Sequence, residues 1–287
     1  MYKSIVTEIV KRQKPKLLVI NASAFSQGNW NLTDEVYLRK WIDNIPMSQN
    51  KLDTVKTIPK NINKDDEKVK DNISDTLYFP LEKYHGNWKD PEAVYTSFVT
   101  RAYMRLSGGG YLKGFYSKTG ITGGRDNLAN IGQPTKEAYV LTDECRAYLK
   151  ELLSYCNKLG IEHVLLLQPP HETQAADKSG LEQIESITKE YGYDFLDLST
   201  DYESSVGIDD SHDFADFEHL NAYGAQKLSS YIGDMAVNQY GIKSDTAKSE
   251  LSRWKKSVKR TKKALKMARE YTDRGEAQVV GEYEAAK

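Results

Sequence analysis

The sequence predicts an α/β protein: a three-layer α/β/α sandwich with a mainly parallel sheet, followed by a basic C-terminal helix. Two observations lead to this prediction. Short continuous apolar runs, typical of buried parallel strands, alternate with segments whose apolar residues recur at helical spacing. The connections between them are short, which favours parallel pairing with right-handed crossovers. In a chain of 287 residues we place an α/β domain at residues 1–240 and a tail at residues 241–287.

The individual elements follow in order along the chain. Each predicted strand comes after a helical segment, and glycine or proline separates the elements. The predicted strands are residues 17–20, 164–167 and 195–198. The predicted helices are the N-terminal segment up to Lys14-Pro15, the segment from Thr142 to Gly160, and residues 181–191 and 221–237.

Two segments depart from this alternation. Residues 55–75 are rich in Lys, Asp and Asn and have few large apolar groups, which predicts an exposed insertion. The segment from Ser249 to Arg274 predicts a basic helix with a narrow apolar stripe of Leu251, Trp254, Val258 and Leu265. One interpretation is a terminal helix that lies on the domain with a solvated basic face. The other is an amphipathic helix for a membrane surface or an acidic partner.

Composition and charge exclude several classes of function. The net charge of -1 argues against binding of nucleic acid by the protein as a whole. No apolar run reaches the roughly 20 residues that span a bilayer, and the N-terminus lacks a signal-peptide pattern. We therefore expect a cytoplasmic protein as the chain is written, and an extracytoplasmic one if an upstream anchor is missing. The five histidines are scattered, so we expect no metal and no cofactor. The sequence leaves the oligomeric state open.

The two cysteines fall within one predicted helix. Cys145 and Cys156 are eleven positions apart, which corresponds to about 16 Å along a helix. A disulfide requires Cα atoms within roughly 7 Å. We therefore expect two buried thiols that do not pair with each other.

One short motif has the residue types of a catalytic site. Asp216 and His219 are three residues apart, immediately before the predicted helix at residues 221–237. This spacing lets the carboxylate accept a hydrogen bond from Nδ1–H of the imidazole, which leaves Nε2 able to take a proton from a hydroxyl group. The alternative is a surface aspartate and a histidine satisfied by the helix start. His212 and Asp213 lie nearby but do not fit this spacing.

The motif also carries a resemblance to a known superfamily. The stretch from Asp216 to Ala225 resembles the C-terminal block of SGNH/GDSL-type hydrolases. It is most similar to the branch that includes teichoic-acid D-alanyl transfer proteins and polysaccharide O-acetyl transferases and esterases. Residues 43–51 and 84–88 resemble the same branch, so the resemblance covers most of residues 1–240. It implies a serine esterase or acyltransferase acting on ester-linked acyl groups of carbohydrate or cell-envelope polymer, with His219 as general base and Asp216 orienting it.

The nucleophile is where the sequence departs from this pattern. Members of the superfamily open with a strand that ends in Gly-Asp-Ser or Gly-Ser-Ser. In one alignment Ser23 ends the first strand and is the nucleophile. In the other, which we favour because a helix precedes the strand and no glycine adjoins Ser23, residues 14–20 match a later strand. The serine would then lie before Met1, and the sheet would have an exposed edge. The alternative function is a truncated or non-catalytic SGNH-like module that binds glycan or a protein partner.

Four further residues are candidates for binding an acylated carbohydrate or small ester substrate. They are Asn21, which the second alignment places near an oxyanion-hole position, His85, Gln168 and His171. Gln168 and His171 follow the C-terminal end of a predicted strand, where open α/β sheets bind ligands. The alternative for Gln168 and His171 is that they only end the strand and bind nothing. The alternative for His85 is that it forms a structural pair at a helix end.

Overall fold

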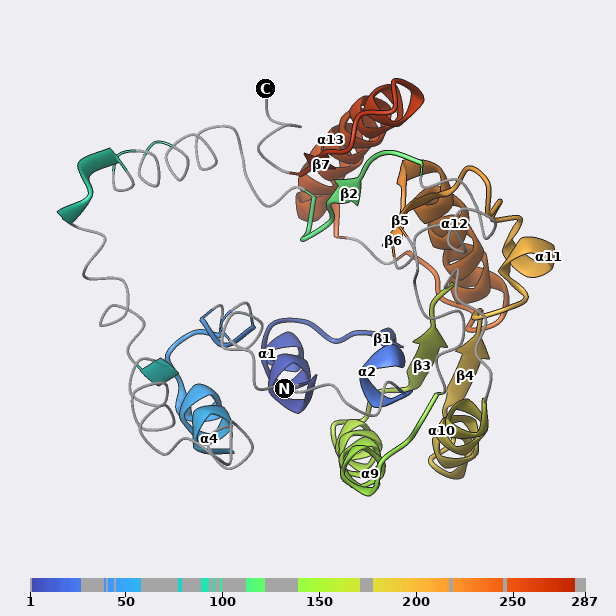
Figure 1. Cartoon of the computed structure of the whole chain (residues 1–287). Helices are drawn as coiled ribbons and strands as arrows, with labels where there is room; N and C mark the ends of the chain where they lie inside the picture. Colours follow the sequence, from blue (N-terminus) through green and yellow to red (C-terminus); the bar gives the residue numbers. More distant parts are fainter. Residues whose placement is uncertain are drawn as a thin grey trace.

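The computed structural model describes residues 2–26, 41–43, 45–57, 112–121, 139–170, 178–216, 219–244 and 247–281, together with residues 39, 77–78, 89–92, 95 and 99. In these ranges the protein is a mixed α/β structure built around a small parallel sheet (Figure 1). The elements that matter here are α1 (Tyr2–Arg12), β1 (Leu17–Asn21), α2 (Ser23–Ser26), α4 (Gln49–Thr57), β2 (Ser117–Lys118), α9 (Asp143–Lys158), β3 (His163–Gln168), α10 (Ser179–Glu190), β4 (Asp194–Asp197), α11 (Tyr202–Val206), β5 (Phe214–Asp216), β6 (His219–Leu220), α12 (Ala222–Asn238), α13 (Lys248–Asp273) and β7 (Val279–Val280).

The three predicted strands form one sheet, as the sequence indicates. Its order is β1-β3-β4, and both pairs are parallel. Leu17 pairs with His163 at one end of β1, and Asn21 pairs with Leu167 at the other. Among the described residues β1 pairs with β3 alone, and Val19 in its middle is 41% exposed. β1 therefore lies at an edge of the sheet that the described residues form.

The predicted helices are also present, and local signals explain their ends. Thr142 caps α9 by accepting a hydrogen bond from the backbone N–H of Cys145 at 3.2 Å. The chain leaves α9 through Gly160, whose φ of 68° is a conformation that glycine adopts without strain. Asn221 caps α12 at its N-terminus. The two cysteines are unpaired, as predicted, but the prediction that both are buried is wrong for Cys145, which is only half-buried.

Apolar side chains of the sheet pack into two different clusters. Val164 and Leu166 of β3 join a cluster with residues of α1, α9 and α10. Leu167 of the same strand joins a second cluster, which also contains Leu198 and Tyr202 and against which Leu228 and Ile232 of α12 pack. In Figure 1, α9 and α10 lie near one end of the strands, and α11 and α12 lie near the other.

The prediction of an exposed insertion at residues 55–75 is wrong for its first three residues. Residues 55–57 complete α4, and Val55 is fully buried there. Lys51 and Thr54 of the same helix are buried as well, so one side of α4 packs against the protein. Residues 58–75 lie outside the described ranges.

Two short antiparallel pairs, which the sequence did not predict, complete the fold. β5 pairs with β6, and β2 pairs with β7 near the C-terminus. The predicted C-terminal helix is confirmed as α13, which contacts α12 and β2. Its buried side consists of Ser257, Ala264, Ala268 and Thr272. The domain division at residue 240 stays a prediction. Across the described part of the chain, no helix has both the length and the apolar character to cross a membrane.

Candidate active site

Asp216 and His219 make the contact that their spacing predicts. Asp216 ends β5, His219 begins β6, and the two residues face each other across this antiparallel pair. Oδ1 of Asp216 lies 2.7 Å from Nδ1 of His219. The sequence predicts no strands here, whereas the structure pairs β5 with β6 and so places the two side chains opposite each other. The resulting pair is an imidazole oriented by a carboxylate.

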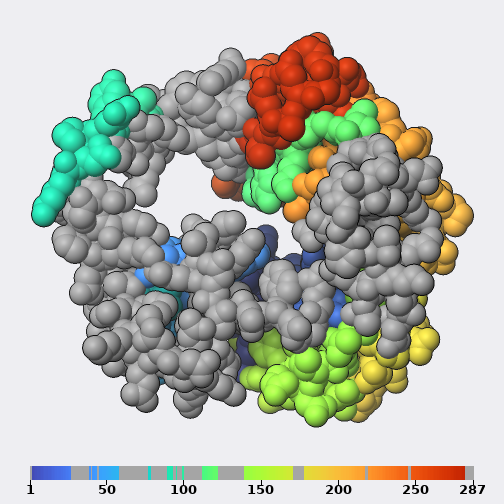
Figure 2. Space-filling view, in the orientation of Figure 1, coloured from blue at the N-terminus to red at the C-terminus, as the bar shows by residue number. Residues whose placement is uncertain are grey.

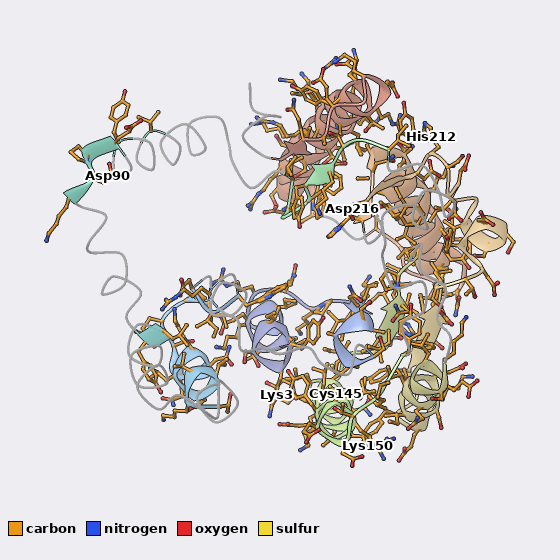
Figure 3. The ribbon with its side chains drawn as sticks, viewed as in Figure 1. Lys3, Asp90, Cys145, Lys150, His212 and Asp216 are labelled. Atoms are coloured by element: carbon orange, nitrogen blue, oxygen red, sulfur yellow. The ribbon has the colours of Figure 1, made fainter. Side chains whose placement is uncertain are left out.

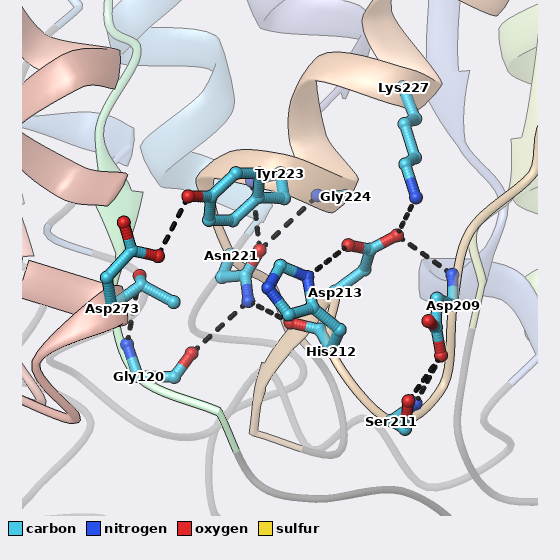
Figure 4. A network of polar contacts seen from close by, with 11 residues as sticks. Gly120, Asp209, Ser211, His212, Asp213, Asn221, Tyr223, Gly224, Lys227 and Asp273 are labelled. Carbon is cyan, nitrogen blue, oxygen red and sulfur yellow. Dashed lines mark hydrogen bonds and ion pairs between the residues drawn. The ribbon is translucent and has the colours of Figure 1, made fainter. Parts of the chain in front are cut away.

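A buried asparagine anchors the β5–β6 pair to the following helix. Oδ1 of Asn221 accepts hydrogen bonds from the backbone N–H groups of Tyr223 at 2.9 Å and Gly224 at 3.3 Å, which caps α12. Its Nδ2 donates to the carbonyl oxygens of His212 at 2.6 Å and Gly120 at 3.2 Å (Figure 4). One side chain thus joins three segments around the candidate pair.

Lys118 is the residue at this site that sequence reasoning missed. Its Nζ lies 2.8 Å from Oδ2 of Asp216 and 3.0 Å from Nδ1 of His219. The lysine is 98 residues away from Asp216 in the chain and reaches the site because β2 lies beside β6. All three side chains are about a third to two-fifths exposed. No local pattern in the sequence signals such a contact.

The other ring nitrogen of His219 has no hydrogen-bond partner among the described residues, and 42% of the side chain is exposed. A nitrogen in this state can accept a proton from an incoming hydroxyl group, provided that the ring proton sits on Nδ1. The arrangement can therefore perform general-base chemistry on an alcohol or water. Figure 3 places Asp216 on the same side of the molecule as His212, away from Cys145 and Lys3.

A second group of the same composition lies beside the first. Nδ1 of His212 is 3.0 Å from Oδ1 of Asp213, and Nζ of Lys227 is 2.6 Å from Oδ2 of the same carboxylate. Asp213 is fully buried. Burial acts to raise its pKa, but hydrogen bonds from the Asp209 backbone, His212 and Lys227 outweigh it and hold the pKa below its usual range. The ring of His212 packs edge-on against Tyr223.

Three of the other predicted residues gather at the carboxyl end of the sheet. Oδ1 of Asn21 accepts a hydrogen bond from the backbone N–H of Ser23 at 2.8 Å. Nε2 of Gln168 donates to Oγ of Ser23 at 3.3 Å, and Oγ of Ser26 donates to Oε1 of Gln168 at 3.2 Å. Gln168 is 1% exposed. Asn21, Ser23 and Gln168 thus lie together, with Ser26 as an unpredicted neighbour, and their roles stay predictions.

This group is not bonded to the candidate pair. Within the described residues, no hydrogen bond joins Ser23 to His219. The nucleophile–base contact that a serine hydrolase requires is therefore not made in this conformation, and the nucleophilic role of Ser23 stays a prediction. The other two predicted substrate-binding residues, His85 and His171, lie outside the described ranges, as does the resembling stretch at residues 84–88.

Comparisons with known proteins add no assignment. No protein-family model matches the sequence, and neither a curated protein nor a solved structure is significantly similar to it. A search of the described part of the chain finds no group of three His, Cys, Asp or Glu side chains placed to hold a metal ion.

Proposed function

We propose that this protein is an SGNH-type serine esterase or acyltransferase that acts on ester-linked acyl groups of carbohydrate or cell-envelope polymer. The observation that supports it is the 2.7 Å contact between Oδ1 of Asp216 and Nδ1 of His219, whose side chain is 42% exposed and whose Nε2 has no hydrogen-bond partner among the described residues. An imidazole held in this way is the general base of serine ester hydrolases.

The proposal includes the fold of this superfamily, a three-layer α/β/α sandwich. Consecutive apolar residues of β3 enter two separate clusters, one with α9 and α10 and the other with α12. A sheet whose two faces both bury apolar side chains against helices is the core of such a sandwich. In this arrangement the carboxyl ends of the strands, where Ser23 and Gln168 lie, are the expected position of a ligand site.

In the proposed reaction His219 removes the proton from a hydroxyl nucleophile through Nε2. The resulting alkoxide attacks the acyl carbonyl, and backbone N–H donors stabilise the oxyanion of the tetrahedral intermediate. The intermediate collapses when the imidazolium returns its proton to the leaving sugar hydroxyl, so that the acyl group stays on the enzyme as an ester. Water or a second hydroxyl then takes the acyl group by the same steps in reverse. Asp216 orients the ring and stabilises its charged form.

Ser23 is the hydroxyl that the first alignment offers as nucleophile. Among the described residues, however, Oγ of Ser23 accepts a hydrogen bond from Gln168 and makes none with His219. The identity of the nucleophile is therefore part of the experiment.

A non-catalytic SGNH-like module that binds glycan or a protein partner is the second candidate. The observation in its favour is Lys118. An ammonium group 3.0 Å from Nδ1 donates to that nitrogen only when Nδ1 carries a lone pair. The ring proton then sits on Nε2, and the histidine cannot act as a base through that atom.

The two candidates differ in whether the chain carries an activated hydroxyl group. The protein is incubated with a serine-directed fluorophosphonate and with p-nitrophenyl acetate, and adducts are read by intact mass. We expect an adduct whose formation falls by about 100-fold or more in His219→Ala. His212→Ala is the matched control, because that side chain is also 42% exposed and contacts an aspartate through Nδ1.

The outcomes separate the possibilities. Loss of the adduct in Ser23→Ala identifies Ser23 as the nucleophile, whereas an adduct that persists there and maps elsewhere identifies another hydroxyl. If adduct formation falls in His212→Ala and not in His219→Ala, the general base is His212. Absence of any adduct in the unsubstituted protein overturns the catalytic proposal and leaves the binding module.

A further inference from the structure

The outer surface of α13 carries three large apolar side chains that the fold does not bury. Leu251, Trp254 and Val258 lie on one side of the helix at spacings of three and four residues, and their exposed fractions are 41%, 49% and 51%. We call them the outer stripe. The sequence predicts one apolar stripe that also includes Leu265. Of these four residues, Leu265 alone packs against the apolar cluster that contains Ala222, Ala264 and Val280.

The packed side of α13 explains why the outer stripe stays outside. Ser257, Ala264, Ala268 and Thr272 face the rest of the protein, where Ala264 and Ala268 pack with Ala222 and Val280. Small side chains let α13 approach its neighbours closely, and a tryptophan has no room in such an interface. Figure 1 shows α13 at the periphery of the molecule, and Figure 2 shows its surface, in red, open on the viewed face.

Positive charge borders the outer stripe. Nζ of Lys113 lies 4.8 Å from the centre of the Trp254 ring, a cation–π contact. Exposed lysines continue from the stripe around the helix; they are Lys248, Lys255, Lys256, Lys259, Lys262, Lys263 and Lys266. Glu250 is the single acidic residue between positions 248 and 266 of the sequence. This combination, an apolar strip with a tryptophan next to a dense row of lysines, is that of helices that lie in the interface of a negatively charged membrane.

We propose that the outer stripe and its lysines bind the surface of an anionic phospholipid bilayer, with α13 lying parallel to the membrane plane. Leu251, Trp254 and Val258 enter the boundary between headgroups and acyl chains, while the lysines pair with lipid phosphates above it. Charge complementarity selects the anionic bilayer over a neutral one. An acidic protein would pair with the lysines but gives no reason for three large apolar side chains beside them. The inference does not depend on the proposed catalytic function.

The test uses the full chain and large unilamellar vesicles in a co-sedimentation assay. One set contains phosphatidylcholine alone, and the other contains ~30% phosphatidylglycerol. We expect binding to the anionic vesicles to be about tenfold tighter or more, and to weaken as salt rises. Trp254→Ser should weaken binding by about tenfold, because it removes the largest inserted side chain. The pair Lys255→Glu and Lys259→Glu should reduce binding to that of neutral vesicles.

The matched control reverses two exposed lysines elsewhere, with Lys158→Glu in α9 and Lys189→Glu in α10. It has the same change in net charge and should bind anionic vesicles within about twofold of the unsubstituted protein. Circular dichroism checks that each variant is folded. Equal binding by both charge-reversed pairs, or no binding to anionic vesicles, overturns the proposal. Binding to a poly-glutamate peptide that Trp254→Ser leaves unchanged, with no vesicle binding, assigns the surface to an acidic partner instead.

Discussion

Nζ of Lys118 and Nδ1 of His219 are 3.0 Å apart, and Asp216 approaches the same nitrogen from 2.7 Å. These two neighbours favour different tautomers of His219. The carboxylate needs a proton on Nδ1, whereas the ammonium group needs a lone pair there. The tautomer of His219, and with it the ability of Nε2 to act as a base, therefore depends on which neighbour prevails.

Lys118→Met should shift His219 toward the tautomer with the proton on Nδ1. The substitution removes the competing donor and leaves Asp216 as the sole hydrogen-bond partner of this nitrogen among the described residues. Two-bond ¹H–¹⁵N correlation spectra of the imidazole ring report the tautomer directly. Lys227→Met is the control, because it removes the lysine of the neighbouring His212 group and should leave the His219 signals unchanged. Identical His219 spectra in Lys118→Met and the unsubstituted protein would contradict this account.

Two glycines of α12 should respond in opposite directions to alanine. A Cβ at Gly224 would lie 2.5 Å from the carbonyl oxygen of Asp213, which also accepts the backbone N–H of Asn221 and cannot easily move. At Gly233 the added atom meets nothing within 4 Å. We expect Gly224→Ala to lower the free energy of unfolding by about 1–3 kcal/mol, and Gly233→Ala to raise it by about 0.5–1 kcal/mol. Urea denaturation measures both. Equal stability of the two variants would refute the close approach at Gly224.

The buried carboxylate of Asp213 should contribute to the pH dependence of stability. Its pKa is lowered in the folded protein. The stabilisation is therefore present above the unfolded-state value of about 3.9 and is lost as the pH falls through the folded-state pKa. We expect Asp213→Asn to cost about 1–3 kcal/mol at neutral pH, and the difference from the unsubstituted protein to shrink below about pH 4.

Denaturant titrations at a series of pH values test this expectation. Asp201→Asn is the control, because Asp201 is exposed and its side chain caps nothing. A difference between the Asp213→Asn variant and the unsubstituted protein that stays constant from pH 7 to about pH 3 would show that the carboxylate does not act through its ionisation.

The two cysteines should differ in their reactivity. Cys156 is fully buried, and burial raises the pKa of its thiol to about 11. Cys145 is half-buried at the other end of α9. At pH 8 only about one Cys156 thiol in a thousand is ionised, so iodoacetamide should modify Cys145 first. Peptide mass mapping follows the reaction, and Cys145→Ser should leave the native protein almost unlabelled. In urea both cysteines should react, and equal native rates would contradict the burial of Cys156.

The sequence predicts those parts of this protein that depend on neighbouring residues. The continuous apolar runs of β1, β3 and β4 and the capping residues Thr142 and Asn221 are local signals, and the structure confirms the elements that they predict. The contact between Asp216 and His219 is also local, because three residues separate them.

The features that the sequence did not predict depend on contacts between distant segments. Lys118 reaches Asp216 across 98 residues of chain, and the two-residue strands β2 and β7 are too short to leave a pattern. The sequence also left open whether the apolar stripe of α13 packs on the domain or faces outward. The answer depends on the closeness of the packed neighbours, which places Ala264 and Ala268 in the interface and leaves Trp254 outside.

The outer side of β1 is a place where a further strand could join this sheet. Among the described residues no strand pairs with its outer side, where Oη of Tyr2 donates to the carbonyl oxygen of Asn21 at 3.4 Å and Val19 is open to solvent. The backbone groups of such an edge form hydrogen bonds with any extended polypeptide that comes alongside, because a ladder of N–H and C=O groups does not depend on sequence. A fourth strand added there would continue the register begun by β3 and remove Val19 from water. Between two copies of the chain, the same chemistry would favour pairing from edge to edge.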